Sequence, residues 1–304
     1  MGKTKCYKYE RRYQIGPFSV EVTTNLNNVL ASLDRFYGCF SSPASSFIDF
    51  RVSLEQGKGL RRWVRPQVNF VFDGVQPFKP LPKDQAVALF EWGLNWCMTN
   101  HCHEYLTVHA AVVEKAGRCL VLPAPPGAGK STLCAALVCS GWRLLSDELT
   151  LIELSDGNKI VPLCRPVCLK NESISIIREF SPQAEFGEVC KGTTKGDVSH
   201  MIAPKAHVAT IENRAPAKWI IFPRYVKGKG ATMSPRSKAT TFFEMARQSF
   251  NFHVLGMTGF KALENVIGAS DCFDFEYSSL EDAVSMINNL SHETRSRELV
   301  HDEC

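Results

Sequence analysis

Several signals of other protein classes are missing from this chain of 304 residues. No stretch approaches the about 18 consecutive apolar residues that a membrane-spanning helix requires. The basic start, MGKTKCYKYERRYQIGPF, lacks the apolar segment of a secretion signal. Cys6 occupies the position where a myristoylation motif needs Ser or Thr. These absences predict a cytoplasmic protein with no membrane partner.

A strong charge imbalance and internal repeats are also missing. The net charge is only +4, and no dense cluster of Lys and Arg is interleaved with aromatic residues. Such a cluster is the usual electrostatic footprint of nucleic-acid binding. We therefore expect no nucleic-acid partner.

Cysteine is abundant, with twelve residues, but no CxxC pair occurs. Most cysteines, such as Cys119 and Cys134, lie in apolar segments, which is typical of reduced thiols in a core. One alternative is a metal-binding scaffold around residues 97–103, where Cys97 and His101 would share a helix face. No second ligand pair follows at zinc spacing. That alternative predicts stoichiometric zinc in the purified protein.

The pattern of apolar residues divides the chain near Tyr105. Residues 1–104 predict a small N-terminal α/β domain with no assigned role, with strands at 13–23, 47–54 and 60–72 and helices at 26–37 and about 84–100. Residues 105–304 alternate strands and helices, as an α/β sheet domain does. Its expected strands are 106–113, 118–122, 142–145, 149–154, 159–163, 219–222 and 272–277. Its expected helices are 131–141, 241–250 and one that opens with a capping box at Ser279, and residues 155–158 predict a hairpin turn.

Residues 120–132 read LVLPAPPGAGKST, an apolar run followed by a loop that ends in Gly-Lys-Ser-Thr. This matches the P-loop (Walker A) pattern GxxxxGK[ST], except that Ala124 replaces the first glycine. In such loops backbone N–H groups cradle phosphates, the lysine reaches the β- and γ-phosphates, and the hydroxyl holds Mg²⁺. The predicted nucleotide-binding residues are Pro126, Gly127, Ala128, Gly129, Lys130, Ser131 and Thr132.

The flanking strand and helix come in the order that a phosphate loop requires, and the helix N-terminus adds to the anion site. The alternative is a Gly/Pro turn before a helix that happens to contain Gly-Lys-Ser. The sequence therefore predicts a bound nucleotide and Mg²⁺. The loop itself does not choose ATP over GTP, and the NKxD motif of GTPases is absent.

Asp147 and Glu148 follow the predicted strand 142–145. A carboxylate at the end of a strand beside a phosphate loop lies opposite Mg²⁺ and near the attacking oxygen. Asp147 is the candidate base, and Glu148 and Asp147, with Ser131, are candidate Mg²⁺ ligands. The alternative is an exposed Ser-Asp-Glu turn or helix cap.

Other candidates are one histidine and four cations. His109 lies in the predicted strand 106–113, where a core histidine is the alternative to a site residue. Phosphoryl transfer needs positive charge, for which Arg165, Lys170, Lys195 and Arg224 are available, each with the alternative of a solvated surface charge. Arg224 is the preferred catalytic candidate because it follows a proline at the end of a buried strand.

The run from Val108-His109-Ala110 through PAPPGAGKST to GWRLLSDE resembles the HPr kinase/phosphorylase family. The segments RPVCLKNESI, TTKG and IIFPRY are similar to the branch called HprK-related kinase A. The resemblance covers roughly residues 105–225. It implies the nucleotide-binding core shared with phosphoenolpyruvate carboxykinases, and it suggests a homo-oligomer.

The resemblance also implies roles for individual residues. Lys130 and Ser131 match the residues that bind phosphates and Mg²⁺, and Asp147 matches the residue that takes the proton from the accepting serine hydroxyl. Glu148 stands where the family usually has a second Asp, and His109 matches the site histidine. The glycine-rich signature with which HPr kinases engage their protein substrate is absent, so HPr itself and the phosphorylase activity are not implied.

These observations predict an ATP-dependent serine kinase that acts on a hydroxyl acceptor of a protein or peptide. Other relatives of this family phosphorylate serine on peptides made for secretion, or free serine, so a small-molecule kinase is one alternative. A nucleotide-hydrolysing or nucleotide-sensing regulatory protein is another.

Overall fold

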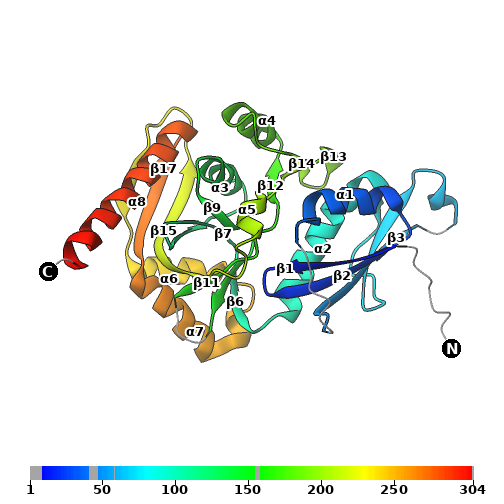
Figure 1. The fold of residues 1–304 in the computed structure, drawn as a ribbon, viewed down its shortest axis with the longest axis horizontal. Helices are drawn as coiled ribbons and strands as arrows, with labels where there is room; N and C mark the ends of the chain where they lie inside the picture. The colour runs from blue at the N-terminus through cyan, green and yellow to red at the C-terminus, as the bar shows by residue number, and fades with distance from the viewer. Residues whose placement is uncertain (1–8, 41–46, 58, 155–157, 303–304) are drawn as a thin grey trace. The chain divides into compact units, whose positions relative to one another are not determined.

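The computed structural model describes residues 9–40, 47–57, 59–154 and 158–302 (Figure 1). It shows a mixed α/β protein with several sheets, which folds into two compact units. The first unit comprises Met1–Cys102, Leu163–Asn171 and Glu185–Glu212, and the second comprises His103–Pro162, Glu172–Ala184 and Asn213–Cys304. Two later segments thus join the N-terminal residues in the first unit. The division by role at residues 104/105 stays a prediction.

The first unit contains a five-stranded sheet with the order β1-β2-β3-β4-β5. Its strands are β1 (Tyr9–Ile15), β2 (Phe18–Thr24), β3 (Phe50–Gln56), β4 (Gln67–Phe72) and β5 (Leu81–Pro82). The helices are α1 (Asn27–Tyr37) and α2 (Ala86–His101), with 3-10 turns at Gly59–Arg62 and Lys83–Gln85. A second sheet, of order β12-β14-β13, is built from β12 (Val167–Lys170), β13 (Cys190–Thr193) and β14 (Gly196–Met201), followed by α5 (Lys205–Val208).

Two predictions for this unit are wrong in detail. The expected single strand 13–23 is a hairpin, because the chain turns at Gly16, whose φ of 60° favours glycine. The expected strand 60–72 begins only at Gln67, because a 3-10 turn takes up Gly59–Arg62. The two predicted helices are confirmed as α1 and α2.

The second unit is built around a nine-stranded sheet, in which seven strands follow the order β6-β10-β11-β15-β8-β7-β9 and β17 and β16 complete the sheet beside β15. The strands are β6 (Tyr105–Val108), β7 (Ala110–Lys115), β8 (Arg118–Pro123), β9 (Arg143–Ser146), β10 (Thr150–Glu153), β11 (Lys159–Val161), β15 (Ala215–Tyr225), β16 (Thr232–Pro235) and β17 (Asp271–Tyr277). The helices are α3 (Lys130–Cys139), α4 (Glu172–Phe180), α6 (Lys238–Arg247), α7 (Phe252–Ala269) and α8 (Leu280–Asp302).

Strand direction in this sheet decides which loops meet. β8 is parallel to β15, and β15 is parallel to β17, whereas β7 runs antiparallel to both β8 and β9. Apart from β16 and β17, the strands are buried along most of their length, because α3 packs against β7 while α7 packs against β15. The ends of β8, β9, β15 and β17 therefore reach one edge of the sheet.

Several predicted elements of this unit are confirmed, and others differ. α3 and β8 lie where the sequence predicts them, and Ser279 caps α8 by accepting a hydrogen bond from the Asp282 N–H at 3.1 Å. The predicted strand 219–222 is longer and continues through Pro223. The predicted strand 106–113 is broken at His109, since β6 pairs with β10 and β7 pairs with β8. The predicted turn at 155–158 lies largely outside the described residues.

Among the helices that the structure describes, none combines the length and the apolar character needed to cross a membrane.

Candidate functional site

The connection between β8 and α3, residues 124–129, is called the glycine loop here. Gly127 and Gly129 have φ values of 86° and 91°, a conformation that glycine adopts without steric cost. Ala124, at the position of the missing glycine, is buried and takes an ordinary negative φ. Gly129 caps α3 without a side chain, so no side-chain hydrogen bond occupies the first-turn N–H groups. Such groups at a helix start favour an anion.

The glycine loop is held from the side of β15 and β17. The Tyr277 hydroxyl donates to the Gly129 carbonyl at 3.2 Å, and the Tyr225 N–H donates to the Ala128 carbonyl at 3.3 Å. Burial raises the pKa of Tyr277, so its hydroxyl remains a donor at physiological pH. The loop conformation thus depends on residues far along the chain.

Gly129→Ala is expected to weaken nucleotide binding and to lower the free energy of unfolding by about 1–3 kcal/mol. An added Cβ would lie 2.7 Å from the Tyr277 hydroxyl, at a φ that alanine adopts poorly. Gly141→Ala is the matched control, because its φ is 89° and nothing lies within 4 Å of the added Cβ. Denaturant unfolding and nucleotide titration of both variants check this. Equal loss of affinity in both would contradict it.

His109, the glycine loop and Asp147 lie at one edge of the sheet. Ala110 of β7 pairs with Pro123, the last residue of β8, so His109 comes just beyond the point where the loop begins. On the other side of β7, Val112 pairs with Ser146, the last residue of β9, and Asp147 follows. Neighbouring strands are about 4.8 Å apart. His109, the glycine loop and Asp147 therefore adjoin the ends of three adjacent strands, β7, β8 and β9.

The charges of Lys130 and Asp147 both influence the pKa of one buried thiol, that of Cys134. Cys134 lies one helical turn after Lys130, and its Sγ contacts the Ser146 carbonyl at 3.9 Å. Burial raises the pKa of Cys134, the Asp147 carboxylate raises it further, and the Lys130 ammonium lowers it. Asp147 is only 4% exposed, which excludes an exposed turn as the explanation of this residue. Glu148 is partly exposed.

His109 is partly exposed and is not a fully enclosed core histidine. Its backbone N–H donates to the Gln248 carbonyl at 2.9 Å, and its ring meets the edge of the Phe250 ring at 6.2 Å between centroids. The Asn251 side chain makes two hydrogen bonds to the backbone of β6. It accepts from the Thr107 N–H at 2.9 Å and donates to the Tyr105 carbonyl at 2.8 Å. Nothing in the local sequence of Asn251 predicts this role.

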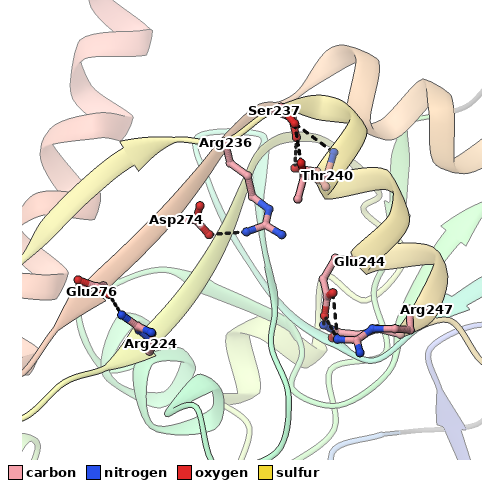
Figure 2. Close-up of polar contacts among 10 residues, drawn as sticks. Arg224, Arg236, Ser237, Thr240, Glu244, Arg247, Asp274 and Glu276 are labelled. Atoms are coloured by element: carbon pink, nitrogen blue, oxygen red, sulfur yellow. Dashed lines mark hydrogen bonds and ion pairs between the residues drawn. The ribbon is translucent and has the colours of Figure 1, made fainter.

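The four candidate cations fall into different units. Arg165, Lys170 and Lys195 belong to the first unit, where Arg165 is buried against Glu91 and the Lys195 ammonium lies 4.9 Å from the centre of the Trp92 ring. Arg224 lies in the second unit, as the glycine loop does. It is 70% exposed and forms an ion pair with Glu276 of β17 (Figure 2).

The donor set at the sheet edge fits Mg²⁺. The Ser131 hydroxyl and the Asp147 and Glu148 carboxylates are hard oxygen ligands, and Mg²⁺ is usually bound by one or two carboxylates together with substrate phosphates. In the described part of the chain, no group of three or more His, Cys, Asp or Glu side chains could hold a metal ion by itself.

Residues 97–103 supply different contacts. The His101 ring packs against the Phe72 and Trp96 rings, at 5.0 and 5.3 Å between centroids. Cys97 is fully buried, and burial raises its pKa to about 12, which disfavours the thiolate that zinc requires. Both side chains therefore have a packing role.

Comparison with known proteins gives two similarities. A family model described as SynChlorMet cassette protein ScmC matches residues 83–164, a range that includes the glycine loop and Asp147. The Hpr(Ser) kinase/phosphatase from Coxiella burnetii aligns with 63% of this chain and 97% of its own, at 13% identity and a TM-score of 0.31. No curated protein matches the sequence. The chain is thus similar to the ScmC cassette proteins over part of its length and distantly similar in structure to an Hpr(Ser) kinase/phosphatase.

Proposed function

We propose that the second unit is an ATP-dependent kinase that transfers the γ-phosphate to a serine-type hydroxyl of a protein or peptide. One observation carries the proposal: a strand–loop–helix with two glycines of positive φ shares its sheet edge with a buried carboxylate, Asp147. A loop whose only role was to connect β8 to α3 would not require the buried Asp147 carboxylate at the same edge.

The roles follow from the chemistry of each group. Backbone N–H groups of residues 126–132 would bind the phosphates, with Lys130 against the β- and γ-phosphates. Ser131 and Glu148 would hold Mg²⁺, which would neutralise charge on the phosphates, while Asp147 would be left to accept a proton. Arg224 would add positive charge at the β15 side of the loop.

In the transfer itself, the acceptor oxygen would form a bond to the γ-phosphorus as the bond to the β–γ bridging oxygen breaks. Asp147 would take the hydroxyl proton, and ADP would leave with the bridging oxygen. His109, at the entrance of the glycine loop, would orient the γ-phosphate or the acceptor. The acceptor is therefore any hydroxyl that reaches Asp147.

The test is incubation with γ-labelled ATP and Mg²⁺ in the presence of serine-containing peptides and, separately, free serine. We expect label on an acceptor and a mass increase of one phosphate. Label on free serine alone would instead identify a small-molecule kinase. Release of free phosphate with no phosphorylated product would identify a nucleotide hydrolase and contradict the proposal.

A further inference from the structure

A cavity of about 490 Å³ lies beside the glycine loop, within the second unit. Pro125 and Ala128 of the loop form part of its wall, and the ends of β15, β16 and β17 form the rest. Its volume is in the range of sites for small molecules, about 300–1,000 Å³. A nucleotide whose phosphates lie in the loop would have this cavity within reach.

Strand register arranges the cavity wall in two rows. Arg224, Glu276 and Thr232 pair across β15, β17 and β16 in the row nearer the glycine loop. The second row, farther from the glycine loop, is formed by Phe222, Asp274 and Ser234, which lie two residues before Arg224 and Glu276 and two residues after Thr232. Alternate residues of a strand share a face, and all six line the cavity.

The cavity and Asp147 lie on opposite sides of the loop strand. β15 adjoins β8 on one side, whereas β7 and then β9, with Asp147 after it, lie on the other. A triphosphate along the loop with its γ end toward Asp147 therefore has its α end toward the cavity. The part of the nucleotide beyond the α-phosphate is the nucleoside.

The polar groups of the cavity suit a nucleoside better than another phosphate. Arg236 forms an ion pair with Asp274 at 2.5 Å, and Arg224 forms one with Glu276 (Figure 2). Arg236 also lies 4.1 Å from the centre of the Phe222 ring, and Lys229 pairs with Glu276 as well. Hydrogen bonds from Lys229 and then Arg224 lower the pKa of Glu276, which stays ionised. Each of these cations is already paired with a carboxylate, and the carboxylate oxygens can accept further hydrogen bonds. Ribose hydroxyls and an exocyclic amino group are donors of that kind.

We infer that this cavity is the nucleoside subsite, with ribose at the row of Glu276 and the base at the row of Ser234. The inference rests on the proposed function, because it takes the glycine loop as the phosphate site. Glu276 accepts a hydrogen bond from a ribose hydroxyl, and the base lies between Pro125 and the row of Phe222, Asp274 and Ser234. The carboxylates make the subsite selective for ribonucleotides.

The first test places a large side chain in the row of Phe222, Asp274 and Ser234, where the base is expected to lie. Ser234 is exposed on the short strand β16, so a large side chain there should leave the fold intact. We expect Ser234→Trp to weaken ATP binding about tenfold or more while the affinity for inorganic tripolyphosphate changes less than about twofold. Thr258→Trp, at an exposed position of α7 that does not line the cavity, is the control and should bind both ligands as the wild type does. Calorimetric titration in Mg²⁺ gives all six affinities.

Two outcomes separate failure of the inference from failure of the proposed function. If the wild type binds ATP and tripolyphosphate but Ser234→Trp binds ATP equally well, the nucleoside lies elsewhere and the kinase proposal stands. If the wild type binds neither, the phosphate site is wrong and the subsite falls with it.

The second test addresses the ribose row. The wild type should bind ATP about tenfold more tightly than 2′,3′-dideoxy-ATP, because a hydrogen bond to a charged acceptor is lost in the analogue. In Glu276→Ala this ratio should fall to about one. A ratio of about one in the wild type, or an unchanged ratio in the variant, would overturn the role of Glu276.

Discussion

Asp147→Asn is expected to lower the rate of phosphate transfer about a thousand-fold while leaving nucleotide affinity within a few-fold of the wild type. Asparagine keeps the size of the side chain and one oxygen acceptor, but its amide does not accept a proton from the attacking hydroxyl. The effect should therefore fall on kcat, since the lost interaction belongs to the transition state. Single-turnover transfer of labelled phosphate and a parallel nucleotide titration measure the two quantities.

Glu148→Gln is the matched comparison at the next residue. Suppose that Glu148 binds Mg²⁺ and Asp147 accepts the proton. Glu148→Gln should then raise the Mg²⁺ concentration that gives half-maximal rate, and excess Mg²⁺ should restore much of the activity. Excess Mg²⁺ should not restore Asp147→Asn. Transfer at the wild-type rate by Asp147→Asn would remove Asp147 as the base, and equal rescue of both variants would assign the two carboxylates to the metal alone.

The parts of this site that lie close together in the sequence could be predicted from it. The apolar run of β8, the glycines of the loop and the start of α3 are local signals, and the structure confirms their order, with α3 at Lys130–Cys139 where 131–141 is predicted. The position of Asp147 at the end of β9 is also local. Each depends on residue types within a few positions, which is the range over which turn chemistry and periodicity act.

Predictions that depend on pairing could not be made this way. The apolar run 106–113 reads as one strand, yet Val108 and Ala110 bond to different neighbours, and only the partners reveal the break at His109. The cavity beside the loop is built by the register of β15, β16 and β17, and periodicity carries no information on register. Gly16-Pro17 is different, because this dipeptide is itself a local turn signal, which the prediction of one strand over 13–23 does not take into account.

Arg165 shows the same limit for a charged side chain. The sequence makes it a candidate for the γ-phosphate, with a solvated surface charge as the alternative, and the structure shows neither. Its guanidinium donates to the Glu91 carboxylate at 2.5 Å and to the Glu91 carbonyl at 2.9 Å, and it also bonds the Asn95 side chain. Its partners Glu91 and Asn95 both lie in α2, several elements earlier in the chain, so no local sequence pattern predicts the pair.

Arg165→Met is expected to lower the free energy of unfolding by about 3–5 kcal/mol. Arg165 and Glu91 are 9% and 6% exposed, and the Tyr37 hydroxyl donates to the same carboxylate. Although burial lowers the pKa of Arg165, the Glu91 carboxylate and the Tyr37 side chain together raise it more, so the guanidinium is charged inside the first unit. Removing it leaves the Glu91 carboxylate buried without its cation. Urea unfolding followed by circular dichroism measures the change.

Two further variants decide between a structural and a catalytic role. Arg165→Met combined with Glu91→Leu should recover most of the lost stability, because the uncompensated charge is removed as well. Arg12→Met, which breaks an exposed pair with Glu21, should cost less than about 1 kcal/mol. An Arg165→Met protein that unfolds like the wild type but transfers phosphate far more slowly would instead restore Arg165 as a phosphate ligand. A structural role of Arg165 changes the free energy of unfolding, whereas a catalytic role changes the rate of phosphate transfer. Because the two quantities are measured separately, the experiment distinguishes the two roles.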